Sequence, residues 1–340
     1  MPTAEARESR WCASDSSARR AERRKVAAED DKAARKVLFS RCLRRGRSRR
    51  EEGFGRSRHG GRSEAFGTGR SGLLPARRVD KSVFGPRRYE IVMEYSVSEI
   101  AAICQGTFCG EDVTVRSVVA DSRRSVATDG ATLFVAIRGR NHDGHDYIAD
   151  LYRRGVRGFM VEREVDARDY PGAGFVRVDK SLAGLQALAA HYRLSFSGTV
   201  VGITGSSGKT TVKEWIAQTA PKGMSLFRSP RSYNSQLGVP LSILMMTGNE
   251  EIALIEAGIS RPGEMERLAA IIRPDVGIFT HLGPEHGENF QSERQKMREK
   301  AQLFGTCRSI VYCGGEPLVE EALRAKAPGV ELRDAVPYEC

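Results

Sequence analysis

The pattern of apolar and polar positions divides the chain near residue 93. Before this point, residues 41–72 are rich in Arg, Gly and Ser and contain few apolar side chains. Such a segment cannot bury enough apolar surface to offset the entropy lost on ordering. From Met93, short apolar runs alternate with amphipathic stretches. We therefore expect residues 1–92 to be a disordered, basic segment, and Met93 is a candidate for the true start of the protein.

Residues 93–198 have the pattern of a small α/β domain. An apolar series with helical spacing follows Ser96, a candidate N-cap. Several short runs have the length and composition of strands. The expected helices are 97–104, 145–156 and 181–196, and the expected strands are 113–121, 131–139, 157–162 and 174–179. We place the end of this domain near Ser197 and Gly198.

Residues 199–340 have the pattern of a second domain. The run "TVVGIT" (199–204) is typical of a strand buried on both faces of a parallel sheet. The expected strands are 199–204, 251–258, 275–283 and 309–315, and the expected helices are 209–220, 263–272 and 292–305. This alternation predicts a doubly wound, mostly parallel sheet. Ligands bind beyond the carboxyl ends of such strands, where the loops after Thr204, Glu256 and Thr280 leave the sheet.

The loop T-G-S-S-G-K-T-T (204–211) is a variant of a phosphate-binding loop. Its glycines, Gly205 and Gly208, allow backbone N–H groups to approach a polyphosphate, and the following helix adds its positive end. The ordinary P-loop has Gly where this chain has Ile203. We expect a polyphosphate as ligand, with Lys209 on the outer phosphates and the Thr210 hydroxyl on Mg²⁺. Ser206, Ser207 and Thr211 complete the predicted phosphate loop, for which the resemblance described next implies ATP. The alternative is a Gly-Ser turn with an incidental lysine.

This loop resembles the ATP loop of the Mur ligases, the family that builds the peptidoglycan stem peptide. Residues 228–242, "RSPRSYNSQLGVPLS", resemble the second signature of the family, with Asn234, Gly238 and Pro240 matching. Residues 254–290 resemble the third signature, which contains Glu256 and His286. Two positions depart from the family pattern, since Ser207 and His281 stand where Asn is usual.

The resemblance implies roles for individual residues. Asn234 would contact ATP, and Thr210, Glu256 and His286 would bind Mg²⁺. The implied catalytic residues are Lys209, Glu256, His286 and Lys300. Lys300 is the candidate for a lysine carbamylated by CO₂ that binds a second Mg²⁺, and Lys296 is a poorer candidate. The alternatives are an exposed helix lysine at 300 and a structural histidine at 286.

The stretches "SYNSQLGVP" and "EAGISRPGEM" are most similar to the family members that add D-alanyl-D-alanine to UDP-N-acetylmuramoyl-tripeptide. "EHGENF" and "EKAQLF" resemble a form fused to alanine racemase in some bacteria. The implied activity is ATP-driven amide bond formation through an acyl phosphate, in peptidoglycan precursor synthesis. The first domain would hold the UDP-sugar, and the matching positions are Asp121, Ser122, Arg123, Asp143, Gly144 and His145. A strand-end turn is the alternative for residues 121–123.

The C-terminal domain that the family uses to dock the amino substrate has no match here, so a fragment with an incomplete central domain is expected. Such a fragment could catalyse the family's reaction only slowly. The alternatives are an inactive or regulatory nucleotide-binding fragment, and another Mur-type ligase.

Charge and cysteine content narrow the class of protein. The formal net charge is +11, but residues 1–92 contain 25 Lys and Arg against 12 Asp and Glu, and the rest contains 29 against 31. A nucleic-acid-binding arm and a transit peptide are therefore alternatives for residues 1–92 alone, and the acidic residues disfavour the latter. The seven cysteines form no zinc-type spacing, and no 18-residue apolar stretch occurs. We expect a cytoplasmic monomer that binds neither membrane nor nucleic acid.

Overall fold

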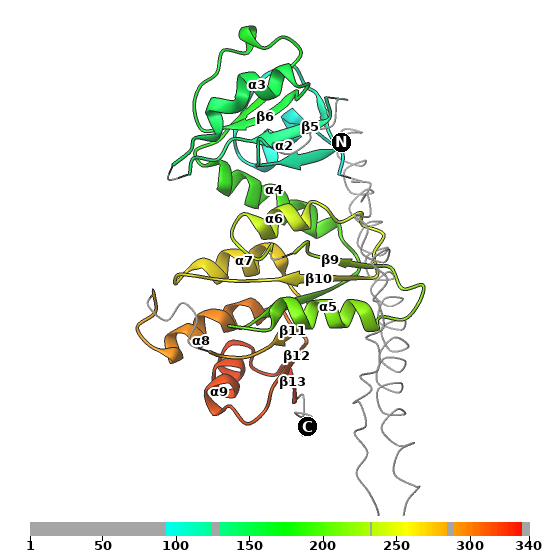
Figure 1. Cartoon of the computed structure of the whole chain (residues 1–340), viewed down its shortest axis with the longest axis vertical. Coiled ribbons are helices and arrows are strands. Elements are labelled where there is room, and N and C mark those ends of the chain that lie inside the picture. Colours follow the sequence, from blue (N-terminus) through cyan, green and yellow to red (C-terminus); the bar gives the residue numbers. More distant parts are fainter. Residues whose placement is uncertain (1–92, 124–129, 140, 232, 284–288, 335–340) are drawn as a thin grey trace, which may run out of the picture. The chain divides into compact units, whose positions relative to one another are not determined.

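The computed structural model describes residues 93–123, 130–139, 141–231, 233–283 and 289–334 (Figure 1). The predicted disordered segment 1–92 lies outside the described residues. Within them, two mainly parallel sheets are flanked by helices, which confirms the α/β class.

The first sheet has five strands in the order β2-β7-β6-β5-β4. β4 to β7 run parallel, and β2 pairs antiparallel with β7 at the edge. The strands are β2 (Thr107–Gly110), β4 (Ser117–Val119), β5 (Thr132–Val135), β6 (Gly158–Val161) and β7 (Gly174–Arg177). Every residue of β5 and β6 is buried, as expected for strands covered on both faces.

The helices of this part begin and end near their predicted positions. They are α2 (Val97–Ile103), α3 (Ile148–Arg153) and α4 (Ser181–Ser195), with short 3₁₀ turns at η2 (Gly144–Tyr147) and η3 (Ala167–Asp169). Ser96 caps α2 and forms a capping box with Glu99, so two backbone N–H groups at the helix start are satisfied. The predicted helix 145–156 is therefore a 3₁₀ turn followed by a short α-helix.

The prediction of one strand over residues 113–121 is wrong. The segment contains two short strands, β3 (Thr114–Val115) and β4, which belong to different sheets. β3 pairs antiparallel with β1 (Tyr95–Ser96), whereas β4 pairs with β5. Arg116 lies between them, and its backbone N–H donates to Ala131 O instead of continuing either ladder. Strand β2 was not predicted.

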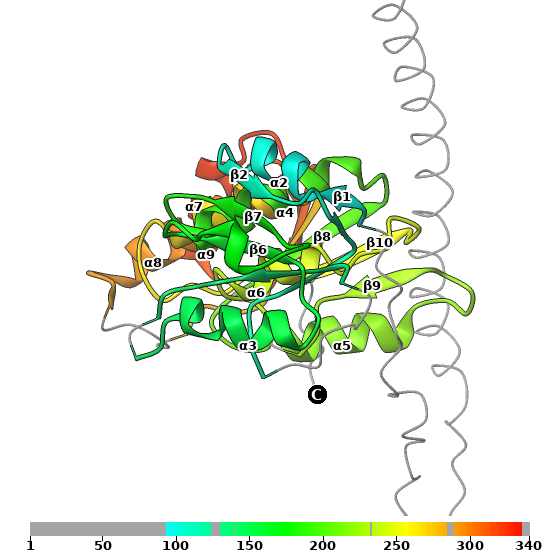
Figure 2. The same ribbon diagram turned by 90° about the horizontal axis from the view of Figure 1, so that it is seen from above.

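The second sheet has six parallel strands in the order β13-β12-β11-β8-β10-β9. They are β8 (Thr199–Thr204), β9 (Leu226–Arg228), β10 (Ile252–Glu256), β11 (Val276–Phe279), β12 (Ser309–Tyr312) and β13 (Glu331–Asp334). β8 lies inside the sheet, between β11 and β10, and is labelled beside β10 in Figure 2. This order confirms the doubly wound parallel sheet, although β9 and β13 were not predicted.

Helices cover this sheet, and α5 lies on the opposite side of β10 from α6 (Figure 1). The helices are α5 (Lys209–Thr219), α6 (Gly238–Ile243), α7 (Glu264–Ile272), α8 (Glu293–Ala301) with η5 (Gln302–Phe304), and α9 (Pro317–Lys326). α6 and α9 were not predicted. Hydrogen bonds join α4 to this part of the chain. Tyr192 Oη donates to Met246 O at 2.6 Å, and Arg193 Nε donates to Ile272 O at 2.8 Å.

Candidate functional site

Three strand ends meet at one edge of the second sheet. The register pairs Ile203 with Glu256 and Thr204 with Phe279, so the loops after β8, β10 and β11 leave the sheet at the same level. β9 and β10 lie on one side of β8 and β11 lies on the other. The edge beside β8 is therefore a switch point in strand order, where parallel sheets bind ligands. The predicted convergence of these loops is confirmed.

The loop after β8 needs its glycines. Gly205 has φ +149° and Gly208 has φ +81°, both in the region that side chains disfavour. A Cβ atom at position 205 would lie 2.0 Å from Thr280 Oγ1, too close for any contact between heavy atoms. Gly208 is the N-cap of α5. The loop therefore turns tightly into the helix and presents its backbone at the helix start.

The start of this loop is fastened to the segment after β11. Thr280 Oγ1 donates to Ser207 O at 2.6 Å, Ser206 N donates to His281 O at 2.7 Å, and Ser206 Oγ donates to Gly283 O at 3.1 Å. His281 therefore supports the loop through its backbone. Its half-exposed side chain places Nδ1 3.3 Å from Glu316 Oε1. The departure from the family's Asn thus leaves the bracing of the loop intact.

Lysines from two helices point at the carbonyl oxygens of the loop. Lys209 Nζ, on α5, donates to Gly205 O at 2.8 Å and to Ser206 O at 2.6 Å. Lys300 Nζ, on α8, donates to Gly205 O at 2.9 Å, and Lys296 Nζ donates to Gly283 O. Lys296 and Lys300 are both only 3% exposed. The alternative of an exposed helix lysine at position 300 is therefore wrong.

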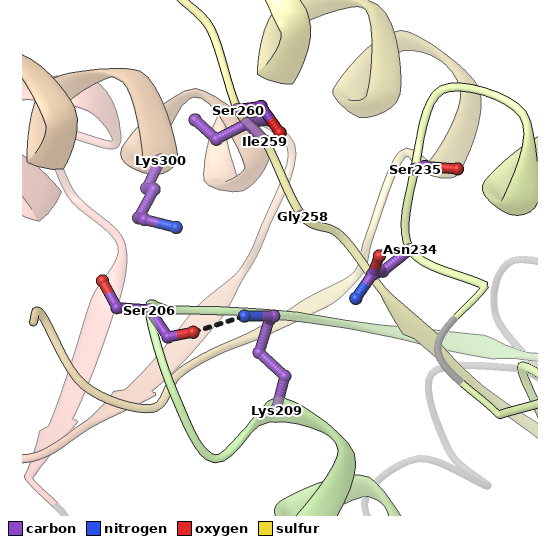
Figure 3. A pocket seen from close by; sticks show the side chains of 8 residues that line it. All are labelled: Ser206, Lys209, Asn234, Ser235, Gly258, Ile259, Ser260 and Lys300. Carbon is purple, nitrogen blue, oxygen red and sulfur yellow. Dashed lines mark hydrogen bonds between the residues drawn. The ribbon is translucent and has the colours of Figure 1, made fainter. Parts of the chain in front are cut away.

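A small cavity lies between these elements (Figure 3). Its volume is about 120 Å³. Lys209 and Lys300 enter it from different helices, as Figure 3 shows, and Asn234 faces it from the segment before α6. Its lining residues are Ser206, Lys209, Asn234, Ser235, Gly258, Ile259, Ser260 and Lys300. Two ammonium groups beside a glycine loop and a helix N-terminus form an environment that favours polyphosphate.

Glu256 ends β10 and its side chain is fully buried. Its Oε2 accepts hydrogen bonds from Thr210 Oγ1 at 3.2 Å and from Asn234 Nδ2 at 3.4 Å. Its Oε1 lies 3.1 Å from Lys213 Nζ, but accepts no well-directed hydrogen bond from the described residues. A buried carboxylate oxygen without such a partner is costly, so the charge of Lys213 compensates it.

The donor set around Glu256 suits a hard cation. A carboxylate oxygen and a hydroxyl oxygen suit Mg²⁺, which usually keeps waters and substrate phosphates as its other ligands. Asn234 turns its Nδ2 donor toward the carboxylate and is not an oxygen ligand in this arrangement. No group of three His, Cys, Asp or Glu gathers within the described part of the chain. His286, the third predicted ligand, lies outside the described residues.

Lys213 is the residue of this site that sequence reasoning missed. It lies in "TVKEWI" (211–216), within the helix predicted over residues 209–220. In the structure Trp215 is 63% exposed, and Lys213 is the one fully buried side chain among the eleven residues of α5. Its polar neighbours come from the segment after β9 and from the end of β10, so the local pattern held no signal for it.

Residues 121–123 form an exposed turn after β4. The Arg123 guanidinium donates from Nε to Asp121 Oδ1 at 2.9 Å and from Nη2 to Oδ2 at 3.0 Å. Ser122 O accepts a hydrogen bond from Arg154 Nη1 at 2.7 Å. The alternative of a strand-end turn thus describes their local structure, and contact with a UDP-sugar stays a prediction.

Asp143 and His145 stabilise the start of η2. Asp143 Oδ1 accepts hydrogen bonds from the backbone N–H and ring Nδ1 of His145, while His145 Nε2 accepts one from Glu162 N at 2.8 Å. The backbone hydrogen bond from His145, followed by the ring, lowers the pKa of Asp143 to about 2. Since Nε2 accepts, Nδ1 carries the proton. The His145 side chain is fully buried, so it supports the loop from within, and a substrate contact at 143–145 stays a prediction.

In the described residues no helix has the length and apolar character needed to cross a membrane.

Comparison with known proteins agrees with the resemblance seen in the sequence. Residues 203–327 match the Mur ligase middle domain. The UDP-N-acetylmuramoyl-tripeptide–D-alanyl-D-alanine ligase of Bacillus subtilis is 29% identical over 237 residues, which is 68% of this chain and 51% of that protein. The enzyme of the same name from Escherichia coli is 31% identical, over 63% of this chain and 46% of that protein. The chain therefore spans about half the length of the curated relatives it matches.

Solved structures agree. The MurF ligase of Thermotoga maritima in complex with ADP is 32% identical, with a TM-score of 0.56, over 64% of this chain and 49% of that one. MurF of Acinetobacter baumannii has a TM-score of 0.63 over 72% of this chain and 54% of that one, at 22% identity, which speaks for the fold alone. Residues 203–327 are therefore a Mur ligase middle domain, and the fold and the relatives that match beyond that domain agree with the Mur ligase family.

Proposed function

We propose that this chain provides the nucleotide and UDP-sugar sites of an ATP-dependent amide ligase. The reaction joins D-alanyl-D-alanine to UDP-N-acetylmuramoyl-tripeptide in peptidoglycan precursor synthesis. The observation that carries the proposal is the meeting of the 205–208 loop, the Lys209 and Lys300 ammonium groups and the Glu256–Thr210 pair at one sheet edge. Relatives bearing the name of this ligase match both parts of the described chain.

ATP would lie across the N-terminus of α5. Backbone N–H groups of residues 207–211 would donate to its phosphates, as at other glycine loops that lead into a helix. Lys209 and Lys300 now donate to loop carbonyl oxygens, and phosphate oxygens would be stronger acceptors for both because they carry charge. Asn234, which faces the same cavity, would contact the nucleotide.

Mg²⁺ would be held by Glu256 Oε2 and Thr210 Oγ1, with His286 as a further ligand. When bound, the ion neutralises charge on the phosphates and orients them for transfer. The protein's own part is to keep the Glu256 side chain fixed. The hydrogen bonds from Thr210 and Asn234 to Oε2 already place that oxygen at the edge of the site.

The chemistry requires activation of a poor electrophile. An oxygen of the tripeptide's terminal carboxylate attacks the γ-phosphorus of ATP, and ADP leaves with the electron pair of the broken P–O bond. The amine of D-alanyl-D-alanine then attacks the acyl carbon, loses a proton and expels inorganic phosphate. Phosphoryl transfer of this kind asks the protein mainly for positioning and charge neutralisation. Lys209 supplies such charge, and Lys300 would do so directly or, if carbamylated, as a ligand of a second Mg²⁺.

The UDP-sugar would bind to residues 93–198, and residues from 199 onward would form the ATP domain. The proposed contacts are Asp121, Ser122, Arg123, Asp143, Gly144 and His145. A reaction that consumes ATP and a UDP-linked precursor is expected in the cytoplasm.

Phosphate release by the full chain tests the proposal. The assay contains ATP, Mg²⁺ and UDP-N-acetylmuramoyl-tripeptide, with and without D-alanyl-D-alanine, and the product is identified by mass spectrometry. Phosphate release that needs both substrates, with a pentapeptide product, is the expected result. Lys209→Ala should abolish it. ATP binding without any turnover would favour a nucleotide-binding or regulatory fragment, and absence of ATP binding would contradict the proposal.

A further inference from the structure

The buried charge of Lys213, on α5, takes no part in the proposed reaction steps. The Lys213 side chain is 0% exposed. Lys213 follows Lys209 by four residues, which places both on the same side of α5, one turn apart. A lysine is almost never buried completely unless its charge is paired. The position therefore needs an explanation beyond helix packing.

Lys213 Nζ lies close to acceptors from two segments, the one that follows β9 and the end of β10. It donates to Ser229 O at 2.7 Å and to Arg231 O at 2.6 Å, both in the segment that follows β9. It also lies 3.1 Å from Glu256 Oε1, at the end of β10. One ammonium group thus joins α5, the segment after β9 and the carboxylate of the candidate metal site.

The segment held by Lys213 leads directly to Asn234. Asn234 Nδ2 donates to the other oxygen of Glu256, Oε2, and Asn234 O accepts a hydrogen bond from Gly258 N at 2.7 Å. Ser229 Oγ also accepts from the Glu256 backbone N–H at 3.4 Å. Lys213 consequently fixes Glu256 directly, and indirectly through the segment that carries Asn234.

The two oxygens of Glu256 have different surroundings. Oε1 faces the buried ammonium, whereas Oε2 receives the side chains of Thr210 and Asn234, and Asn234 lines the cavity. A carboxylate free to rotate would present either oxygen, or both, to a cation. The charge pair removes that freedom.

We propose that Lys213 is a positioning residue for the nucleotide–metal site. It holds Glu256 Oε1, so that Oε2 alone faces the site. It also holds the backbone carbonyls of Ser229 and Arg231, shortly before Asn234, whose side chain meets Oε2. This inference rests on the proposed function for the identity of the ligand, Mg²⁺ with ATP. The pairing of Lys213 with Glu256 does not depend on which ligand binds.

A double-mutant cycle in the full chain tests the pairing. Lys213→Met keeps the length of the side chain and removes the charge, which leaves Glu256 buried and unpaired. Breaking a buried pair is strongly destabilising, so we expect the melting temperature to fall by about 10 °C. Lys213→Met combined with Glu256→Gln should melt several degrees above Lys213→Met alone, because no charge is then uncompensated. The exposed Lys222→Met is the matched control and should leave the melting temperature unchanged.

If Lys213→Met does not fold, recovery of a folded chain by the added Glu256→Gln supports the pairing equally. Additive effects of the two substitutions, or a double variant that also fails to fold, would overturn it.

Metal dependence tests the positioning role. Affinity for a fluorescent ATP analogue is measured with and without Mg²⁺ in wild type, Lys213→Met and Lys213→Arg. In Lys213→Met the Mg²⁺ concentration for half-maximal effect should rise about tenfold, as for loss of other groups that orient metal ligands. Affinity without Mg²⁺ should change less than about twofold, and Lys213→Arg should recover part of the Mg²⁺ effect. A merely structural lysine would weaken both affinities equally.

The two failures are distinguishable. Wild type that binds no nucleotide contradicts the proposed function, whatever the variants do. Wild type that binds nucleotide with Mg²⁺, together with a Lys213→Met variant of unchanged Mg²⁺ dependence, overturns this inference alone.

Discussion

The ammonium group of Lys300 and the carbonyl oxygen of Gly205, 95 positions apart in sequence, lie 2.9 Å from each other. The hydrogen bond joins α8 to the first residue of the loop after β8. We expect Lys300→Ala to lower phosphate release at least a hundredfold, because a preorganised charged donor at a reacting phosphate contributes about that much. If the active form is carbamylated, short carboxylates added to Lys300→Ala should restore activity.

Arg298→Ala is the control for Lys300→Ala, since Arg298 lies on the same helix but is exposed. It should retain activity within about twofold. Unchanged activity in Lys300→Ala would contradict a catalytic role for this lysine.

Gly205→Ala should impair the loop sharply. The new Cβ would lie 2.0 Å from Thr280 Oγ1, in a backbone conformation with φ +149°. The loop must shift, so ATP affinity measured by titration calorimetry should fall more than tenfold. Gly223→Ala is the matched control, because Gly223 also has a positive φ, +93°, but an added Cβ would contact nothing within 4 Å. It should reduce stability by about 1 kcal/mol and leave ATP affinity unchanged. Equal effects of both substitutions on ATP affinity would argue against a specific role for Gly205.

Thr210→Val removes the hydroxyl that donates to Glu256 Oε2 at 3.2 Å. It keeps the branched shape of the side chain. We expect ATP binding to lose most of its enhancement by Mg²⁺, because a proposed ligand of the ion and a hydrogen bond to its carboxylate disappear together. The measurement is nucleotide affinity at several Mg²⁺ concentrations. Thr219→Val, at the far end of α5, is the control and should behave as wild type. A normal Mg²⁺ response in Thr210→Val would exclude this hydroxyl as a ligand.

Stability at low pH tests the Asp143–His145 contact. Hydrogen bonds from His145 lower the pKa of Asp143 from 3.8 to about 2. A lowered pKa means that the ionised form stabilises the fold, so this contribution is complete above about pH 4 and is lost as pH falls towards 2. Asp143→Asn should therefore lower the urea midpoint at pH 7, and the gap to wild type should close between about pH 4 and 2. Asp146→Asn, at an exposed neighbour, should show no such pH-dependent gap. A gap that stays constant on acidification would show that the Asp143 charge contributes nothing.

The sequence predicts elements best where the decisive signal is local. The glycine spacing at 205 and 208 and the apolar run 199–204 identified the loop and its strand, and Ser96 marked the start of α2. The interruption at Arg116 was missed because it depends on pairing: β3 joins β1, whereas β4 joins β5. β13 was missed because its residues, "ELRD", are mostly polar, as an edge strand allows.

The candidate site shows the same limit. Lys209 and Thr210 were predicted because they directly follow a glycine loop, and Glu256 was predicted from the resemblance of residues 254–290 to a Mur ligase signature. Lys213 was missed because its burial depends on Ser229, Arg231 and Glu256, up to 43 positions further along the chain. A single-sequence pattern places Lys213 on a helix but cannot reveal which strands will close over it.

The central place of β8 has a consequence for synthesis of the chain on the ribosome. β8 and its loop emerge early, but their neighbour β11 follows only at residues 276–279, and the bracing Thr280 comes after it. A nascent chain that has reached residue 270 therefore contains the glycine loop without the contacts that hold it. Pairing across such sequence distances is slow because the intervening chain must first be ordered. A nucleotide would therefore bind only to chains that have already completed this pairing, and its binding would stabilise only those folded molecules.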